Sequence, residues 1–386
     1  MEINEVKMGG SYKLTEEQEM VRAMARKIAK DRLAPRAAEI DRMGEFPWDI
    51  IELFRENHIL DMPVPAEYGG QGVDALSCHL VIEEFATECA NSAHALADHW
   101  LGIHPLELAC NEEQKKRIFP NLGRKLVSFS ITEPEAGSDV RNLKTRAVLK
   151  GDNYILNGVK CFCTDGAVAD YIVIFAQTDP GAGSHGISAF FVEKGTPGLS
   201  IGKIEEQMGM RGTRACEIIL EDCLVPEENL LGKEGDGFEI AMETFDLSRP
   251  TDAILAVGIA QGALNYAKEY AKHRVQFGRP IAEFQGMQFM LADMAIQIEA
   301  ARNLVYRAVS LIDDGAPDPM MSAMSNCFAT DVAMKVTTDA IQVLGGYGYM
   351  KDHPVERMFR DAKLMQIVEG TNQIQRIVIA RNLLRR

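Results

Sequence analysis

The spacing of apolar residues changes twice along this chain of 386 residues, and these two changes constrain the fold more than any other feature. Up to about residue 124 apolar residues recur at helical intervals, and from Leu126 they form short runs rich in β-branched and aromatic residues. After Gly237 helical spacing returns. The pattern predicts a mainly α protein with an inserted β domain, divided into an N-terminal helical domain (1–124), a central β domain (125–236) and a C-terminal helical domain (237–386).

Helix start signals divide the first domain into several helices. Thr15 with Gln18, and Asn111 with Gln114, have the spacing of capping boxes, and Asp74 is placed to cap a further helix. Other segments are predicted from pattern alone: helices at Trp48–Leu60 and Ala75–Cys89, a helix stopped or bent by Pro35, an irregular loop at Pro63–Gly72, and a core helix with satisfied polar groups around Asp98, His99, Trp100 and His104.

Six candidate strands fill the middle domain: Val127–Thr132, Lys144–Leu149, Tyr154–Asn157, Tyr171–Ala176, Ile187–Glu193 and Glu217–Leu220. The residues Gly151-Asp152-Asn153 predict a hairpin turn between two of them. Gly181 to Gly186 match the GxGxxG pattern, but a dinucleotide-binding motif of this kind follows a strand and opens a helix. Because this copy lies between two strands, we expect a hairpin loop.

Two long apolar stripes at helical spacing predict an antiparallel bundle in the last domain. Their members are Met287, Met290, Leu291, Met294, Ile298, Ala301 and Val305 in the first, and Phe328, Val332, Val336, Ile341 and Leu344 in the second. Gly345 and Gly346 follow the second stripe, where glycine can end a helix and let another chain segment approach closely.

Glu369 lies on a joint between two helical patterns near the end of the chain. Gly370 and Thr371 follow it and are suited to begin the second helix. Such joints between rigid helices often carry catalytic groups. A single carboxylate at a helix end is also commonly a solvated charge, so the local sequence leaves both interpretations open.

Charge and hydropathy exclude several classes of partner. The formal net charge is -15, and no block of Lys and Arg stands out, which argues against nucleic acid or an anionic membrane as the main partner. No apolar run reaches the length of a membrane span, and the residues from Met1 to Glu5 lack the pattern of a secretion signal. We therefore expect a cytoplasmic protein without membrane insertion.

The eight cysteines are scattered, which predicts buried free thiols rather than disulfides. Cys161 and Cys163 are the only close pair, and no second pair or histidine lies nearby at ligand spacing, so we expect no metal site. The sequence contains no Walker A, HExxH or GxSxG motif, so triphosphatase, zinc-protease and α/β-hydrolase functions lack their signatures.

The order of domains and motifs resembles the flavin-dependent acyl-CoA dehydrogenase family over essentially the whole chain. Four segments are similar to motifs of that family: Phe129 to Asp139, Lys160 to Thr164, Arg274 to Gly278 with Gln285 and Gln342 to Gly346, and Glu369-Gly370-Thr371. The resemblance implies a helical N-terminal domain, a central β-barrel or sandwich and a C-terminal four-helix bundle. It also implies FAD as the cofactor, an acyl-CoA thioester as the substrate, an electron-transfer flavoprotein as the redox partner and a homotetramer built as a dimer of dimers. The segments around Arg274 and Gln342 are expected to hold the adenosine diphosphate end of FAD across a dimer interface.

The resemblance assigns roles to individual residues. Glu369 is expected to remove the α-proton of the thioester, on the face opposite to the flavin N5 that takes the β-hydride. The expected FAD contacts are Phe129, Ile131, Thr132, Gly137, Ser138, Phe162, Thr164, Arg274, Phe277, Gln285, Gln342, Gly346, Thr371 and Gln373. The expected substrate contacts are Ser138, Asp246, Arg249, Val368, Gly370 and Asp98. Some relatives carry the base at the position of Ser248, and serine there favours Glu369.

Two departures from the family pattern concern the acyl group. Val368 stands where many relatives have tyrosine, and Asp98 with Trp100 occupies the region that shapes the far end of the acyl pocket. We expect a short, branched or cyclic acyl group, and a second hypothesis makes Asp98 an additional acid or base beside a ring. Ser92 stands at the arginine position of glutaryl-specific relatives, so glutaryl specificity is not expected.

Two alternatives to a dehydrogenase remain from the sequence. The same residues could run the reaction backwards as an enoyl-CoA reductase in an anaerobe, because the electron partner sets the direction. A non-catalytic scaffold that binds CoA or flavin is the other alternative, and the intact Glu369 and flavin motifs count against it.

Overall fold

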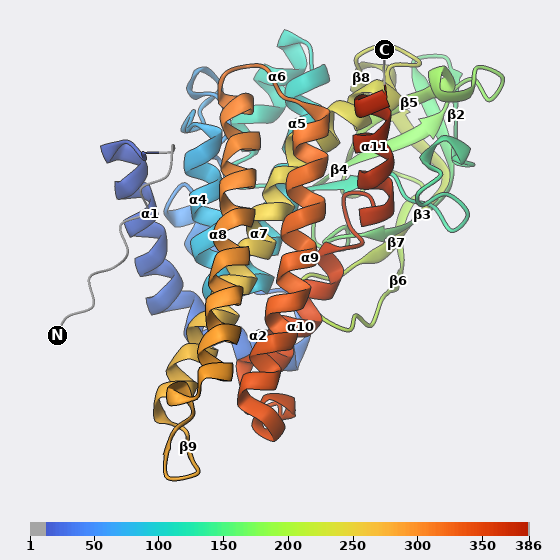
Figure 1. Ribbon diagram of the computed structural model, residues 1–386. Helices are drawn as coiled ribbons and strands as arrows, with labels where there is room; N and C mark the ends of the chain where they lie inside the picture. The colour runs from blue at the N-terminus through green and yellow to red at the C-terminus, as the bar shows by residue number, and fades with distance from the viewer. Residues whose placement is uncertain (1–12, 385–386) are drawn as a thin grey trace.

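The computed structural model describes residues 13–384, so the ends of the first and last predicted domains and the Met1–Glu5 segment lie outside the described part. Helices occupy the chain as far as Asn121, strands lie between Val127 and Leu231, and helices follow from Gly237 onward (Figure 1). This order confirms the predicted fold class. The domain boundaries at 124/125 and 236/237 stay predictions.

The N-terminal helices begin where the capping signals predict. The Thr15 hydroxyl accepts a hydrogen bond from the Gln18 amide at 3.2 Å, and the capping boxes at Thr15 and Asn111 are both complete. The helices are α1 (Glu16–Ile28), α2 (Ala37–Met43), α3 (Trp48–Glu56), α4 (Ala75–Glu88), α5 (Ala90–Ala109) and α6 (Glu112–Ile118). Around Pro35 the chain forms a π-helical and then a 3₁₀ turn, and α3 is shorter than predicted because His58 takes a left-handed conformation.

The middle of the chain forms one sheet of eight strands: β1 (Val127–Ser130), β2 (Arg146–Lys150), β3 (Asn153–Cys163), β4 (Tyr171–Gln177), β5 (Ile187–Glu193), β6 (Leu199–Ile204), β7 (Cys216–Pro226) and β8 (Leu230–Leu231). The order is β6-β7-β3-β2-β4-β5-β8, and β1 pairs with β4 in parallel. All six predicted strands are present, but β6 and β8 were missed and β3 and β7 are longer than predicted. The Gly181–Gly186 segment joins β4 to β5, which confirms the predicted hairpin loop.

Strand β4 is buried on both faces. Val173 and Phe175 pack into the core shared with the helices, while Ile172 and Ile174 point into a separate core enclosed by the sheet. A strand covered on both sides reads as a continuous apolar run, which explains why β4 was easy to recognise. This strand is therefore the wall between the sheet and the helical part of the molecule.

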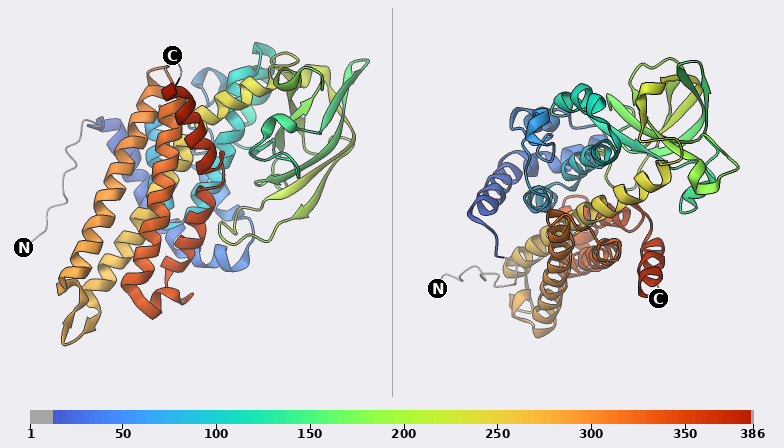
Figure 2. Two further views of the ribbon diagram at one scale, coloured as in Figure 1. Left: turned by 45° about the vertical axis from the view of Figure 1, so that its right-hand side comes forward. Right: turned by 90° about the horizontal axis from the view of Figure 1, so that it is seen from above.

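The C-terminal helices are α7 (Gly237–His273), α8 (Gln285–Asp313), α9 (Pro319–Leu344), α10 (Pro354–Met365) and α11 (Asn372–Leu384). Helices α7 to α10 form the predicted bundle, and a small hairpin of β9 (Val275–Gln276) and β10 (Arg279–Pro280) joins α7 to α8. Seen from above, α7 runs from the sheet into the middle of the molecule, between the N-terminal helices and the C-terminal ones (Figure 2).

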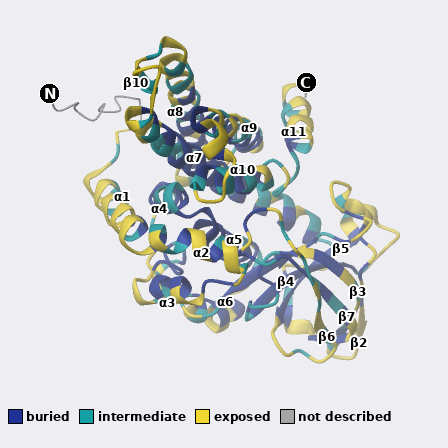
Figure 3. Ribbon diagram, turned by 90° about the horizontal axis from the view of Figure 1, so that it is seen from below, coloured by how far each residue is buried: buried dark blue, intermediate teal, exposed yellow. Residues whose placement is uncertain are grey.

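Burial follows this arrangement (Figure 3). Helices α5 and α7 are dark along most of their length, whereas α1 and α11 expose one side to solvent. All eight cysteines are buried free thiols, as predicted. No helix within residues 13–384 combines the length and the apolar character needed to cross a membrane.

Candidate active site

Glu369 lies on a strained turn between α10 and α11. Its φ is 54°, in the left-handed region that side chains other than glycine rarely adopt, and Gly370 follows with a φ of 87°. The Thr371 hydroxyl accepts a hydrogen bond from the Ile374 amide at 3.4 Å, at the start of α11. Two consecutive left-handed residues reverse the chain here, so the Glu369 carboxyl group is directed by the backbone.

Helices α7 and α11 hold this turn in place. Ser248 Oγ on α7 donates a hydrogen bond to Glu369 Oε2 at 2.6 Å. The Gln375 side-chain amide on α11 donates to the carbonyl oxygens of Glu369 at 2.9 Å and Gly370 at 2.7 Å. Burial raises the pKa of Glu369, while the Ser248 hydrogen bond and the Arg249 charge partly oppose this. A carboxylate with a raised pKa is a better proton acceptor than a solvated one.

The run Asp98, His99 and Trp100 on α5 separates into two structural residues and one exception. His99 accepts a hydrogen bond from the Val127 amide at 3.1 Å and lies 3.1 Å from the Leu122 carbonyl oxygen, and the Trp100 indole donates to the Leu60 carbonyl oxygen at 3.0 Å. These contacts confirm the predicted core helix with satisfied polar groups. Asp98 is also buried, but its Oδ2 atom has no hydrogen-bond partner.

Three further carboxyl groups lie close enough to interact electrostatically with one another or with Glu369. Burial raises the pKa of Asp98 well above its ordinary value, and the charges of Asp165, Glu369 and Asp252 raise it further. Burial, with the charge of Glu369, does the same to the pKa of Asp252. Burial raises the pKa of Asp165 to about 7, although the Arg214 amide bonded to its Oδ1 opposes this. Glu369 therefore lies among carboxyl groups whose pKa values are all raised, mainly by burial.

Two segments predicted to contact flavin lie side by side. The Cys161 amide of β3 donates to the Thr132 carbonyl oxygen at 2.9 Å, which joins the Ile131–Thr132 segment to Phe162 and Thr164. Phe162 has a φ of 55° and its side chain is 63% exposed. An aromatic ring held outward by strained backbone provides a flat apolar surface, which suits a planar ring system. Phe129 packs against Phe245 of α7, so these segments lie near the start of that helix.

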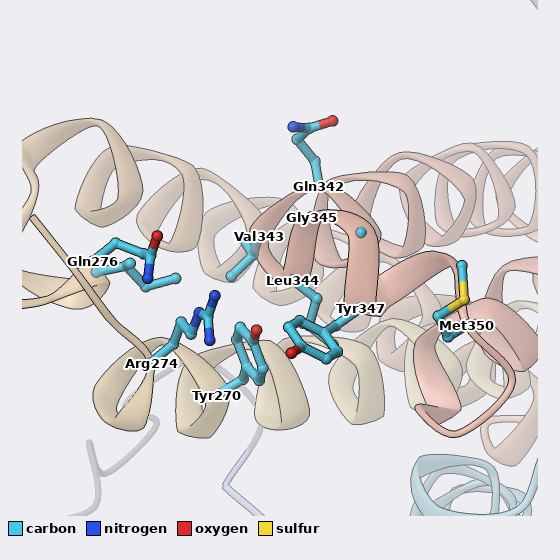
Figure 4. A pocket seen from close by; sticks show the side chains of 11 residues that line it. Tyr270, Arg274, Gln276, Gln342, Val343, Leu344, Gly345, Tyr347 and Met350 are labelled. Atoms are coloured by element: carbon cyan, nitrogen blue, oxygen red, sulfur yellow. The ribbon is translucent and has the colours of Figure 1, made fainter.

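The opposite end of α7 borders a cavity of about 520 Å³, which contains Arg274, Gln342 and Gly346 (Figure 4). Arg274 lies over the Tyr347 ring at 5.3 Å and has no acidic partner among residues 13–384. An unpaired guanidinium beside glycine backbone suits a phosphate or a nucleotide, whereas the Gln342 side chain points away from Arg274 (Figure 4). Phe277, 94% exposed, and Gln285 do not line this cavity, so the chain by itself does not bring them to it.

Other predicted site residues lie around the turn. Arg249 Nη1 and Asp246 Oδ1 form an ion pair at 2.6 Å, and burial raises the pKa of Asp246 to about 6, which Arg249 opposes. Val368 and Gly370 flank Glu369 and are half-buried. Gly137, Ser138 and Gln373 are exposed. No group of three metal-binding side chains occurs in the described part of the chain.

Sequence reasoning missed two features of the site. Asp252 lies four residues after Ser248 on α7, and this spacing places both on one helix face, a signal that the sequence does contain. Lys160 is fully buried and pairs with Glu133 at 2.7 Å beneath the flavin segments, and its Nζ also bonds the Ile131 carbonyl oxygen at 3.2 Å. Lysine is almost never fully buried without such a partner, so its role appears only in the fold.

Comparison with known proteins identifies the family. Models of the N-terminal, middle and C-terminal domains of acyl-CoA dehydrogenase match residues 15–125, 128–223 and 235–384. The cyclohex-1-ene-1-carbonyl-CoA dehydrogenase of Syntrophus aciditrophicus is 48% identical, over 96% of this chain and 91% of that one. Butyryl-CoA dehydrogenase from Megasphaera elsdenii is 42% identical with a TM-score of 0.95, over 97% of this chain and 100% of that one.

A chain in a structure of the electron transferring flavoprotein of Acidaminococcus fermentans, studied for flavin-based electron bifurcation, is 49% identical with a TM-score of 0.96. The alignment covers 98% of this chain and 100% of that one. Each domain of the family is thus matched in order, and the relatives are similar over nearly their full length. This chain belongs to the acyl-CoA dehydrogenase family and is an FAD-dependent oxidoreductase.

Proposed function

We propose that this enzyme dehydrogenates a short, branched or cyclic acyl-CoA between Cα and Cβ, with Glu369 as the base, and passes the electrons to an electron-transfer flavoprotein. The observation that carries the proposal is the Glu369 turn. It holds a half-buried carboxylate in a strained backbone conformation, and it lies beside Ser248 and near the segments predicted to contact flavin.

Several residues at and around the turn have separate roles in the proposed reaction. Ser248 occupies Oε2 of Glu369, which leaves Oε1 to receive the α-proton. The Glu369 amide N–H makes no hydrogen bond to another residue of the described chain, so it can donate to the thioester carbonyl oxygen as negative charge develops there. Bound FAD supplies the hydride acceptor, and Phe129, Ile131, Thr132, Phe162 and Thr164 are the residues proposed to hold its ring. Asp246 and Arg249 are proposed to contact CoA.

The acyl group is proposed to be small or cyclic. Val368 leaves more room beside Glu369 than the tyrosine of many relatives, and relatives of this chain act on cyclohexene-carbonyl and butyryl thioesters by name. Comparing kcat/KM for butyryl-, cyclohexanecarbonyl- and palmitoyl-CoA tests this, and a preference for palmitoyl-CoA would contradict it. If Asp98 is an additional acid or base, Asp98→Asn should abolish turnover of a ring substrate, and unchanged turnover would show Asp98 to be structural.

One experiment separates the proposed activity from its alternatives. Glu369→Gln is expected to keep the yellow flavin spectrum and thioester binding but lose most turnover, since only the proton acceptor is removed. Anaerobic titration with acyl-CoAs should bleach the wild-type flavin and leave the variant coloured. A bleached variant would mean that another residue is the base. A faster reaction of enoyl-CoA with the reduced enzyme and its physiological partner would favour the enoyl-CoA reductase.

The oligomer is proposed to supply part of each FAD site. Arg274 follows Ser248 by 26 positions, which corresponds to about 39 Å along α7. An extended FAD is shorter than this, so one molecule cannot contact both the flavin segments and the Arg274 cavity of the same chain. A second copy placed two-fold symmetrically could bring its cavity to the first copy's flavin, which supports a dimer as the unit of the proposed tetramer.

A further inference from the structure

Asp98 and Asp252 are buried acids without partners. Each of the two residues is only 7% exposed to solvent. Neither carboxyl group has a hydrogen-bond partner among residues 13–384, and Oδ2 of Asp98 is fully covered. Buried polar atoms in native proteins nearly always have partners, so each exception requires an explanation.

Other buried carboxyl groups show what a structural role looks like in this protein. Four of the other five within residues 13–384 accept hydrogen bonds from the chain: Glu83 from Arg302 and Tyr306, Glu133 from Lys160, Lys144 and Thr145, Asp165 from the Arg214 amide, and Asp361 from the Met210 amide. The fifth, Asp61, accepts none from this part of the chain, but it lies 3.6 Å from the Nδ1 atom of His58. Asp98 and Asp252 differ from these four because nothing in the fold satisfies them. Their partner is therefore to be sought in a ligand.

Both acids lie near Glu369. Asp252 follows Ser248 by one helical turn, and Ser248 bonds the Glu369 carboxylate, so Asp252 lies one turn further along the wall that carries the base. Asp98 approaches from α5, and both acids interact electrostatically with Glu369. Asp252, Asp98 and Glu369 thus come near one another from three separate elements, α7, α5 and the turn before α11.

We propose that Asp252 and Asp98 form a polar subsite of the acyl pocket, which binds an uncharged hydroxyl or carbonyl substituent on the acyl group, away from the thioester. The proposal rests on the proposed function and deepens it by naming a substrate class. A protonated carboxyl group both donates and accepts a hydrogen bond, which matches a hydroxyl group or a ketone. A distal carboxylate would add negative charge beside Glu369, so dicarboxylic substrates are disfavoured.

Matched thioester pairs test the subsite: cyclohexanecarbonyl-CoA against 4-hydroxycyclohexanecarbonyl-CoA, and butyryl-CoA against 4-hydroxybutyryl-CoA. The wild-type enzyme should prefer the hydroxylated member of at least one pair. Asp252→Val should lower kcat/KM for that member by about 10- to 100-fold relative to the unsubstituted member, because only the hydroxylated thioester loses a hydrogen bond. Asp252→Asn keeps a donor and an acceptor and should retain most of the preference.

Thr251→Val is the control, because Thr251 is also buried on α7 but bonds His79 instead of facing the pocket. It should alter stability without changing the ratio between paired substrates. Flavin content and urea unfolding identify any variant that fails to fold. If Asp252→Val does not fold, the substrate ratios of Asp252→Asn are compared with those of wild type instead. Equal ratios in wild type and Asp252→Val would overturn the subsite, as would a preference for amino- or carboxyl-substituted thioesters. If butyryl-CoA bleaches the flavin but the kcat/KM ratio within each pair is the same in wild type and Asp252→Val, only the subsite is overturned. If no thioester bleaches the flavin, the proposed function is overturned.

Discussion

At the level of single residues, Ser248 acts directly on Glu369, the proposed base. Its hydroxyl donates to Oε2 of Glu369 at 2.6 Å and so stabilises the ionised form of the carboxyl group against the cost of burial. Two opposing effects therefore set the affinity of Glu369 for a proton. Removal of one of them should be visible in the pH dependence of the reaction.

Ser248→Ala is expected to raise the pKa of Glu369. A hydrogen bond to a charged group contributes about 1.5 to 3 kcal/mol, so its loss should move the acid limb of the kcat/KM profile about 1 to 2 pH units higher. With Glu369 as the proposed base, activity requires its ionised form, so the variant should lose activity first at the low end of the pH range and approach wild type at high pH. Profiles with a slow substrate, for which proton removal limits the rate, measure the shift.

Ser248→Thr keeps the hydroxyl group and provides the control, with a limb near that of wild type. An acid limb that stays in place in Ser248→Ala would show that the hydroxyl does not act on Glu369 in the working enzyme. A uniform loss of activity at all pH values would instead indicate damage to the pocket.

Individual site residues were predictable only where a local pattern reveals them. Glu369 follows from its joint and its motif, and Gly370 is required by a φ of 87° that glycine adopts readily. Asp252 could not be placed, because its relation to Glu369 depends on how α7 meets a turn more than 100 residues later. Asp98 was a predicted site residue, but the sequence does not separate it from its polar neighbours His99 and Trp100. The structure does, because His99 and Trp100 have hydrogen-bond partners in the described part of the chain and Asp98 has none.

At the level of elements, strand β3 is held in place by a buried ion pair. Lys160 is 0% exposed and bonds both Glu133 and the Ile131 carbonyl oxygen, while Glu133 also accepts from the Lys144 and Thr145 amides. The pair thus connects β3 to the segment between β1 and β2 that is proposed to contact flavin. Its loss should affect the stability of the sheet and the affinity for FAD together.

Lys160→Met is expected to destabilise the protein by about 3 to 5 kcal/mol, because Glu133 is left as a buried charge without its cation. Urea unfolding of the FAD-free protein measures this, and fluorescence titration with FAD measures the weakened affinity. In the double variant with Glu133→Gln the charge is removed as well, so part of the stability should return. A double variant no more stable than Lys160→Met would mean that the pair does not act as a unit.

Helix α5 is joined to β1 by His99, and this contact should make stability depend on pH. Burial lowers the pKa of His99 to about 4, from an ordinary value near 6.5. The unfolded chain therefore binds a proton more readily, so the contribution of His99 is complete above about pH 6.5 and is lost as the pH falls towards 4. At its largest this contribution is about 3 kcal/mol.

The variant His99→Gln cannot titrate, so its disadvantage relative to wild type should be greatest at pH 7.5 and should shrink as the pH falls to 5. Urea midpoints at pH 7.5, 6 and 5 give this difference, and the buried acids, which titrate in the opposite sense, cancel because they are common to both proteins. The exposed His185→Gln serves as the control, with a constant difference. A constant difference for His99→Gln would disprove the linkage.

Elements were predictable in proportion to how completely they are buried. β4 and β5 pack on both faces and are largely apolar, so their predicted first and last residues agree with the structure to within one residue. β6 carries exposed residues along most of its length, and β8 has only two residues, so neither gives a signal. The helices with capping boxes began where predicted because a cap is a local interaction.

At the level of the whole molecule, the long helix α7 separates two segments that are proposed to form one FAD site. The flavin segments lie near its start, where Phe129 contacts Phe245, and the Arg274 cavity lies at its end, about 39 Å beyond Ser248. The family resemblance assigns each half of this site to a motif and places the second half across a dimer interface, but a motif carries no information on the distance between the two halves of one chain. Because of this separation, the proposed dimer would be required for catalysis and not only for stability.

Complementation between two inactive variants tests that dimer. In Glu369→Gln the base is lost but the Arg274 cavity is intact, whereas Arg274→Asp keeps the base and repels the FAD phosphates. If Arg274 serves the partner's flavin, a mixed dimer contains one site in which Glu369 and Arg274 are both intact. Random pairing of equal amounts should then restore about a quarter of wild-type activity, since half of the dimers are mixed and half of their sites are complete. Co-expression with two affinity tags isolates the mixed dimers, and co-expression of each variant with itself is the control. If Arg274 serves its own chain, no mixture contains a complete site, and activity would stay at the level of the single variants.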